Sequence, residues 1–211
     1  MHQTQPLLHI DNLHFSHPQQ ALWRGWSTDL YPGITLVRGG DGSGKTTLLR
    51  LLAGDLVPQQ GTMVLQGVDG AADPDGYRRQ VFWQDPRAHA LHDITGQAWL
   101  ATLSARYPAW DDSAMAAHVK GWGLSPHLEK PLYQLSSGSQ RKVLMAAALA
   151  SGAALTLIDE PTAGLDRPST LYLQQALASA AKSPTPPRAI VVAHYEALDG
   201  VPWQQVLDLP H

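Results

Sequence analysis

A glycine-rich run at residues 39–47 carries the clearest chemistry in this sequence. It fits the pattern GxxxxGK followed by Ser or Thr, between an apolar stretch at residues 34–37 and a helix-like stretch at residues 47–53. Backbone N–H groups of such a run close on phosphates, and the following helix N-terminus points at the anion. An ordinary glycine-rich turn is the alternative, and the Lys-Thr pair in this context argues against it. We therefore predict a nucleotide triphosphate site made of Gly39, Gly40, Asp41, Gly42, Ser43, Gly44, Lys45, Thr46 and Thr47.

Two pairs of residues could do chemistry on the phosphates. In the glycine-rich run, Lys45 would neutralise charge on the outer phosphates, and the Thr46 hydroxyl would ligate Mg²⁺. Asp159 and Glu160 follow an apolar, strand-like stretch at residues 155–158. Asp159 would hold the magnesium through water, and Glu160 could activate the attacking water. An acidic turn after a strand is common by itself, but its pairing with the glycine-rich run favours the catalytic interpretation.

A serine-rich turn at residues 135–139 is a further candidate phosphate contact. It reads Leu-Ser-Ser-Gly-Ser and stands directly before a predicted helix that ends at Ala150. Such a turn offers hydroxyls, N–H groups and the positive end of a helix dipole to an anion. Taken alone, a Ser-Gly turn of this kind is more often a simple helix cap.

These motifs together make the sequence resemble the ABC ATPase family, over essentially the whole chain. The serine-rich turn is similar to the family's LSGGQ signature, with Ser137 and Ser139 in place of a glycine and the glutamine. Gln84 matches the Q-loop glutamine, and residues 163–166 match the D-loop. His194, directly after an apolar stretch at residues 190–193, matches the switch histidine.

The resemblance implies a role for each matched residue. Glu160 would be the general base, and the other residues acting on the phosphates would be Lys45, Gln84 and His194. The magnesium ion would be held by Thr46, Gln84 and Asp159. Beyond the glycine-rich run, ATP would be contacted by His17, Ser136, Ser137, Gly138 and Asp166. His17 stands where the family usually places an aromatic residue against adenine, so a smaller ring would stack there.

The resemblance also implies partners. In this family the signature of one subunit closes over the phosphate loop of another, so we expect a head-to-tail homodimer with ATP between the subunits. We expect a membrane-spanning permease as partner and a cytoplasmic location on the inner face of the cell membrane. No apolar run approaches the ~20 residues that span a bilayer. The short length and the modified signature favour a small exporter-type ATPase, similar to the haem-exporter subunit.

Two other functions fit parts of the sequence. One is a soluble ABC ATPase that acts on DNA or ribosomes, and the other is a phosphate-loop kinase. The net charge of −3 argues against a nucleic-acid partner, which would favour a basic surface. The absence of cysteine excludes thiolate metal sites such as zinc insertions. The signature-like turn and Glu160 argue against a kinase.

The elements that must position these residues indicate an α/β fold. With 44% hydrophobic and 16% charged residues the chain is globular, and strands alternate with helices. We expect a phosphate-loop NTPase core with a mostly parallel sheet, an N-terminal antiparallel β subdomain and an inserted helical subdomain. The chain would be a single domain, 1–211, with a core at 1–87 and 151–211. The helical subdomain would occupy 88–150 and carry the signature. We also predict strands at 62–65 and 80–83, turns at 69–76 and a helix at 171–182.

Overall fold

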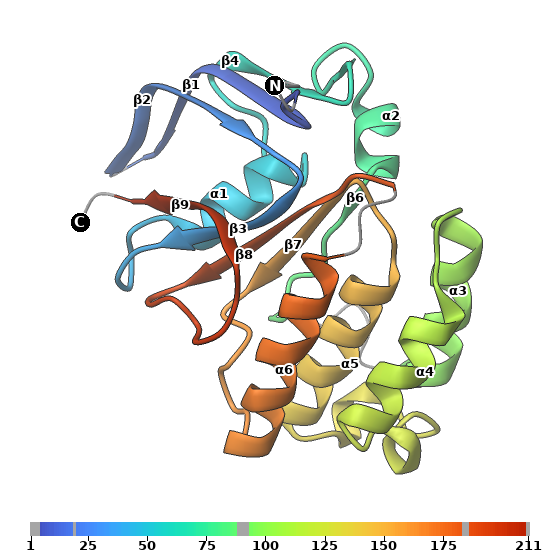
Figure 1. Cartoon of the computed structure of the whole chain (residues 1–211). Helices are drawn as coiled ribbons and strands as arrows, with labels where there is room; N and C mark the ends of the chain where they lie inside the picture. The colour runs from blue at the N-terminus through green and yellow to red at the C-terminus, as the bar shows by residue number, and fades with distance from the viewer. Residues whose placement is uncertain (1–4, 19, 88–92, 183–185, 210–211) are drawn as a thin grey trace.

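The structure, a computed structural model, describes residues 5–18, 20–87, 93–182 and 186–209. These residues form an antiparallel sheet and a parallel sheet, with helices on both faces of the parallel one (Figure 1). The arrangement confirms the predicted α/β fold class with its two kinds of sheet.

The antiparallel sheet comes from the N-terminal part of the chain. Its order is β2-β1-β4-β5, built from β1 (Leu8–His17), β2 (Gln20–Leu30), β4 (Gln60–Leu65) and β5 (Val68–Asp69). Side chains alternate along β1, where Leu8 and Ile10 are buried and His9 is exposed. The buried face packs onto α1 (Lys45–Leu52), the helix that follows the glycine-rich run.

The parallel sheet carries the candidate functional residues at the C-terminal ends of its strands. Its order is β6-β7-β8-β3-β9, and each neighbouring pair is parallel. The strands are β3 (Gly33–Arg38), β6 (Val81–Phe82), β7 (Leu155–Asp159), β8 (Ala189–His194) and β9 (Trp203–Asp208). Both β7 and β8 are buried along their whole length, as expected for apolar strands covered on both faces. Because the strands run in the same direction, the C-terminal ends of β3, β7 and β8 lie at the same end of the sheet. The glycine-rich run, Asp159 and His194 are found there.

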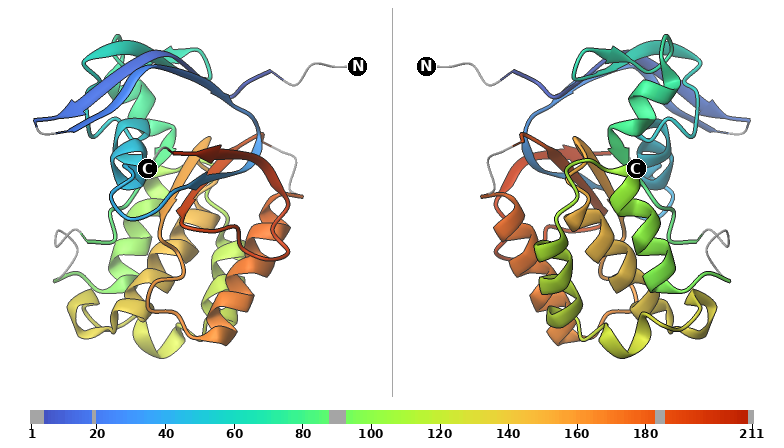
Figure 2. Two further views of the ribbon diagram at one scale, coloured as in Figure 1. Left: turned by 90° about the vertical axis from the view of Figure 1, so that its left-hand side faces the viewer. Right: turned by 90° about the vertical axis from the view of Figure 1, so that its right-hand side faces the viewer.

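The helices cover the parallel sheet from two sides. In Figures 1 and 2, α1 lies between the two sheets, and α5 and α6 lie on the opposite face of the parallel sheet. The helices α3 and α4 pack against α5, away from the sheet. Their bounds are α2 (Pro74–Arg79), α3 (Gly96–Arg106), α4 (Asp112–Gly121), α5 (Ser137–Ala150) and α6 (Arg167–Ala180), with 3₁₀ turns η2 (Ser125–His127) and η3 (Leu132–Gln134).

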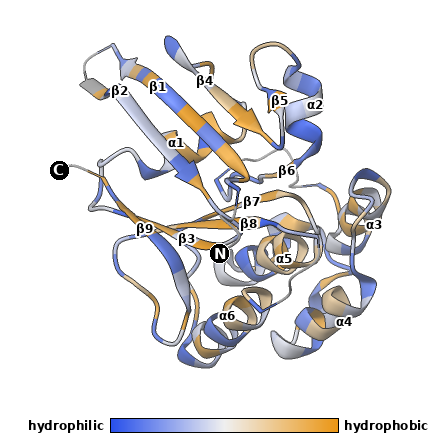
Figure 3. Cartoon of the chain, turned by 45° about the horizontal axis from the view of Figure 1, so that its top comes forward, coloured by the Kyte–Doolittle hydropathy of each residue, from blue (hydrophilic) through white to orange (hydrophobic). Residues whose placement is uncertain are grey.

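The parallel strands divide the core into two apolar clusters. Leu157 and Val191 face the cluster that contains α1 and the antiparallel sheet. Their neighbours Ile158 and Val192 face the other cluster, which contains α3 to α6. The alternation follows from the two-residue period of a strand, and Figure 3 shows the hydrophobic segments along β7, β8 and α1. Among the described helices, none is both long and apolar enough to cross a bilayer.

The structure corrects the predicted boundaries in three places. Residues 69–76, expected to be turns, include the end of β5 and the start of α2, where Asp73 caps the helix by accepting from the Gly76 N–H at 2.8 Å. The strand expected at 80–83 is only β6, because residue 80 caps α2. Helix α6 begins at Arg167, four residues earlier than predicted, because Asp166 serves as its N-cap.

Candidate nucleotide site

The glycine-rich run lies between β3 and α1, beside a cavity of about 330 Å³. Gly42 and Gly44 have φ of 77° and 94°, the left-handed region that favours glycine. Gly44 is also the N-cap of α1, so the run leads directly into a helix N-terminus whose free N–H groups favour an anion. The cavity is lined by residues 40–47 together with His17, Leu22, Arg87 and Glu160.

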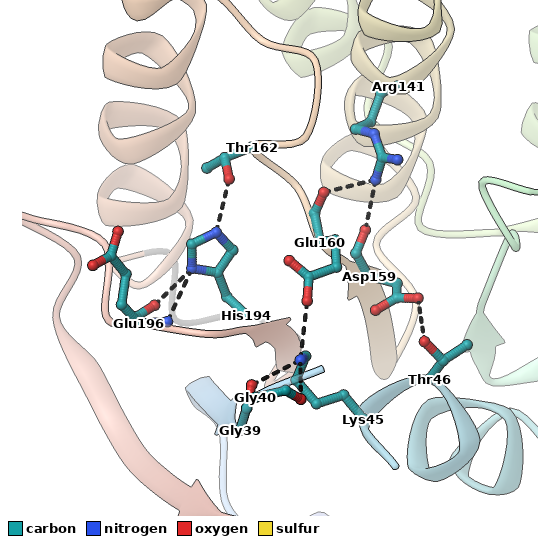
Figure 4. A network of polar contacts seen from close by, with 10 residues as sticks. All are labelled: Gly39, Gly40, Lys45, Thr46, Arg141, Asp159, Glu160, Thr162, His194 and Glu196. Carbon is teal, nitrogen blue, oxygen red and sulfur yellow. Dashed lines mark hydrogen bonds and ion pairs between the residues drawn. The ribbon is translucent and has the colours of Figure 1, made fainter. Parts of the chain in front are cut away.

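The Lys45 ammonium is buried beside this cavity and is surrounded by three oxygens. Its side chain is 6% exposed, and Nζ donates to the carbonyl oxygens of Gly39 and Gly40 at 2.7 and 3.0 Å. It also forms an ion pair with Glu160 Oε1 at 3.1 Å (Figure 4). Phosphate oxygens could take the place of these ligands, because they offer the same charge-assisted bonds.

Thr46 and Asp159 form a pair of oxygens that fits a hard cation. The Thr46 hydroxyl donates to Asp159 Oδ2 at 2.7 Å, across the start of α1 and the end of β7. The other carboxylate oxygen, Asp159 Oδ1, is buried and has no hydrogen-bond partner among the described residues. Burial raises the pKa of the Asp159 carboxyl, an effect that the Thr46 hydrogen bond opposes. Hydroxyl and carboxylate oxygens are the ligands that Mg²⁺ prefers, so the donor set fits that ion.

Glu160 has an unusual backbone next to its carboxylate. Its φ is 43°, in the left-handed region that non-glycine residues adopt infrequently. The Arg141 guanidinium donates from Nη1 to the carbonyl of Glu160 at 2.6 Å and to that of Asp159 at 3.0 Å. The Glu160 N–H donates to the Ala193 carbonyl at 2.9 Å. The main chain at Glu160 is therefore held by two other elements, α5 and β8.

His17 is the last residue of β1 and lies beside the glycine-rich run. Its Nε2 is 3.2 Å from the Thr47 hydroxyl, and its ring meets Phe15 edge-on with centroids 5.2 Å apart. It is exposed and lines the cavity together with Leu22. The cavity lining thus includes a ring and an aliphatic side chain as well as the glycine-rich run.

Two of the expected catalytic residues do not line this cavity. His194 is 1% exposed, and its Nε2 lies 2.7 Å from the Thr162 hydroxyl (Figure 4). Its Nδ1 lies 2.8 Å from the Glu196 carbonyl oxygen and 3.3 Å from the Glu196 backbone nitrogen. Gln84 lies in a separate small pocket with Arg141 and Asp159.

The signature and D-loop residues also stand apart from the cavity of their own chain. Ser136 is the N-cap of α5, accepting from the Ser139 N–H at 3.2 Å, and Ser137 is exposed. Gly138 packs so closely on the Gly164 carbonyl that a Cβ there would clash. Asp166 caps α6 through the Ser169 N–H at 3.0 Å, and hydrogen bonds to Ser169 lower the pKa of its carboxyl. The structure therefore gives Ser136 and Asp166 helix-capping roles.

The structure adds residues that the sequence did not reveal. Arg87 and Leu22 line the cavity, and Arg141 and Thr162 hold Glu160 and His194. Arg87 stands three residues after Gln84 and Arg141 follows the signature, so proximity to the motifs was a usable signal. Thr162 carried no signal, because its contact depends on how the D-loop turns back toward β8.

Known proteins share both the sequence pattern and the fold. Residues 24–163 match the family profile described as ABC transporter. The chain is 38% identical over 157 residues to the cytochrome c biogenesis ATP-binding export protein CcmA of Bordetella parapertussis. The aligned residues cover 71% of this chain and 67% of that protein. It is 30% identical over 174 residues to the CcmA of Salmonella typhi, with 82% and 83% covered.

A solved structure shows that the fold is shared beyond these relatives. An ABC transporter ATP-binding protein from Pyrococcus furiosus superposes with a TM-score of 0.75 at 19% identity, over 96% of each chain. From the family match, these relatives and the fold, the chain belongs to the ABC transporter family, as an ATP-binding and ATP-hydrolysing subunit.

Proposed function

We propose that this ATPase subunit drives an export step in cytochrome c biogenesis. In this proposal two identical subunits work together on a membrane-spanning partner, at the inner face of the cell membrane. The observation that carries the proposal is the likeness to CcmA export proteins, which also favours transport over work on DNA or ribosomes. The acidic net charge of −3 supports the absence of a nucleic-acid partner.

ATP binds through an exchange of ligands at Lys45. Phosphate oxygens replace the Gly39 and Gly40 carbonyls and the Glu160 carboxylate around the ammonium, while N–H groups of residues 40–47 donate to the other phosphate oxygens. His17 stacks on the base at the open end of the cavity. The exchange frees Glu160 from its ion pair.

Thr46 and Asp159 would hold a magnesium ion with their oxygens, and Gln84 would approach it from the neighbouring pocket. The ion supplies positive charge that neutralises the phosphates. Glu160, once freed, accepts a proton from the attacking water at a carboxylate oxygen. His194 contacts the γ-phosphate after its Nε2 leaves the Thr162 hydroxyl.

The second subunit completes the site. Ser136 and Ser137 are exposed, and neither lines the cavity of its own chain. A hydroxyl-rich helix N-terminus of this kind can contact the ATP held by a partner. This supports a head-to-tail pair in which the signature turn of each subunit, with Asp166 nearby, covers the other's nucleotide.

Genetic complementation tests the proposed export step in cytochrome c biogenesis. The chain is expressed in a bacterium that lacks its own CcmA, and c-type cytochromes are measured by haem staining of membrane proteins. We expect the wild type to restore them and Glu160→Gln to fail, since loss of a general base lowers turnover by ~10²–10⁴. The exposed Glu129→Gln is the matched control and should restore them.

Two outcomes would contradict this function. If a well-expressed wild-type chain with ATPase activity restores no c-type cytochromes, the proposal that the chain drives an export step in cytochrome c biogenesis is wrong. If Glu160→Gln restores cytochromes as well as the wild type does, ATP hydrolysis through Glu160 is not needed for the step. Binding of labelled ATP to the purified Glu160→Gln variant shows that its nucleotide site has remained intact.

A further inference from the structure

The helix that starts at the signature turn is bonded to the peptide that carries Glu160. Arg141 lies in the first part of α5, two residues after Ser139. Its Nη1 donates to two successive carbonyls, Asp159 at 3.0 Å and Glu160 at 2.6 Å (Figure 4). A single side chain therefore connects α5 to the end of β7.

These bonds act where the main chain needs support. The φ of 43° at Glu160 lies in a region that L-residues avoid because Cβ approaches the following carbonyl oxygen. Such a conformation persists only where surrounding contacts determine it. Here the Glu160 N–H donates to Ala193 at 2.9 Å, and Arg141 binds the Glu160 carbonyl.

The backbone at Glu160 in turn determines where its carboxylate points. With the present φ, Oε1 lies 3.1 Å from Lys45 Nζ, at the edge of the phosphate cavity. A rotation of this peptide would move the carboxylate away from the position next to the γ-phosphate. The bond from Arg141 therefore influences a group that Arg141 itself does not touch.

Arginine suits this position better than lysine does. The guanidinium is planar with fixed N–H directions, so one edge can serve two neighbouring carbonyls at defined angles. Arg141 is half-buried and shares a small pocket with Gln84 and Asp159. Burial lowers the pKa of the Arg141 guanidinium, the nearby carboxylates of Asp159 and Glu160 oppose this effect, and Arg87 adds to it.

We propose that Arg141 is a positioning residue that connects the signature helix to the Glu160 peptide. Through it, the carboxylate of each subunit is set for hydrolysis only when that subunit's own α5 is correctly placed. Since the N-terminus of α5 faces the partner's nucleotide in the proposed dimer, Arg141 couples one ATP site to the base of the other. The inference rests on the role proposed above for Glu160.

Steady-state ATP hydrolysis by the purified full chain tests the inference. We expect Arg141→Ala to lower kcat by about 10²-fold, the cost of a misplacement of about 1 Å, while KM and the affinity for ATP stay within threefold, as expected when ground-state binding is kept. Added ethylguanidinium should restore part of the kcat by occupying the vacated space. Arg106→Ala, which removes an exposed arginine at the end of α3, should change neither value and show no rescue.

Arg141→Lys gives a second measurement, and it carries the test if Arg141→Ala does not fold. A lysine reaches one carbonyl but cannot hold both, so kcat should fall between the values of the wild type and of an inactive variant. A kcat within twofold of the wild type in the folded Ala or Lys variant would overturn the inference. So would a lower kcat accompanied by an equal loss of ATP affinity and no rescue, because that pattern belongs to a purely structural role.

A parallel measurement of Glu160→Gln separates this inference from the proposed function. If Glu160→Gln turns over ATP like the wild type, the role of Glu160 fails and the positioning role fails with it. If Glu160→Gln is inactive while Arg141→Ala is active, only the role of Arg141 fails. If both are inactive, the double variant should be no slower than Glu160→Gln, because both changes remove one function.

Discussion

At the scale of single residues, the ammonium of Lys45 is the group on which nucleotide binding depends in the proposed site. It is buried, and its three oxygen ligands lie between 2.7 and 3.1 Å from Nζ. Lys45→Ala should weaken ATP binding by at least about 10²-fold, since charge-assisted bonds contribute about 1.5–3 kcal/mol each. Isothermal titration calorimetry measures this directly.

The exposed Lys120 on α4 provides the matched control for this change. Lys120→Ala removes the same charge far from the glycine-rich run and should leave the dissociation constant for ATP unchanged. An affinity of Lys45→Ala within twofold of the wild type would remove Lys45 from the site.

Residue types at fixed spacing predict where the site lies in the sequence, but they do not predict the directions of its side chains. The spacing from Gly39 to Thr46 predicts a loop with a buried lysine at its end. The strand before this loop and the helix after it restrict the loop to one conformation. The place of His194 at the end of an apolar, strand-like stretch singles it out in the sequence, yet its ring is turned to Thr162. Its direction depends on the path of the D-loop, which no local pattern encodes. The carboxylate of Glu160 likewise depends on Arg141, a residue 19 positions away in the sequence.

At the scale of elements, helix caps decide where helices begin, and α4 gives a clear example. Asp111 accepts from the Ala114 N–H at 2.9 Å and from the Ser113 hydroxyl at 2.6 Å at the start of α4. These hydrogen bonds, that of Ser113 first, lower the pKa of the Asp111 carboxyl. Asp111→Ala should lower the free energy of unfolding at neutral pH by about 1 kcal/mol.

The same cap has a predictable pH dependence. The pKa is lower in the folded than in the unfolded state, so the stabilisation is fully present above the unfolded value of about 3.9 and is lost as the pH falls through the folded value. Asp111→Asn keeps an acceptor that does not titrate. Urea unfolding between about pH 5 and 2.5 should therefore show the wild type losing stability relative to Asp111→Asn. Parallel loss in both proteins would contradict the assignment.

Buried strands are predicted from the sequence more accurately than helix starts. Buried strands such as β7 and β8 were predicted with nearly correct bounds, because an uninterrupted apolar run leaves few alternatives. Helix α2 was missed, since Asp73 and Pro74 fit a turn as well as a helix start. Helix α6 starts earlier than predicted for a related reason, because Asp166 both matches the D-loop pattern and caps the helix.

At the scale of the whole molecule, the exposed signature turn predicts an assembly that depends on nucleotide. Glu160→Gln should bind ATP without hydrolysing it and so accumulate the closed pair. Light scattering should show a mass near that of the single chain, 22.9 kDa, without nucleotide or with ADP, and about twice that value with ATP. The double variant Lys45→Ala/Glu160→Gln should stay at the lower mass. A Glu160→Gln variant saturated with ATP that remains a monomer would contradict the homodimer.

The ion pair between Lys45 and Glu160 also bears on how the site empties. Free phosphate must displace a carboxylate and two carbonyls from the ammonium, and it lacks the further contacts that the other phosphates and the base of ATP would make. In the proposed site, ATP would meet the same cost but would offset it through contacts along the loop and with His17. In the proposed cycle the Lys45–Glu160 ion pair would thus compete with the product and would re-form as phosphate departs. Inorganic phosphate should therefore be a poor inhibitor of ATP hydrolysis, which steady-state assays with added phosphate would measure.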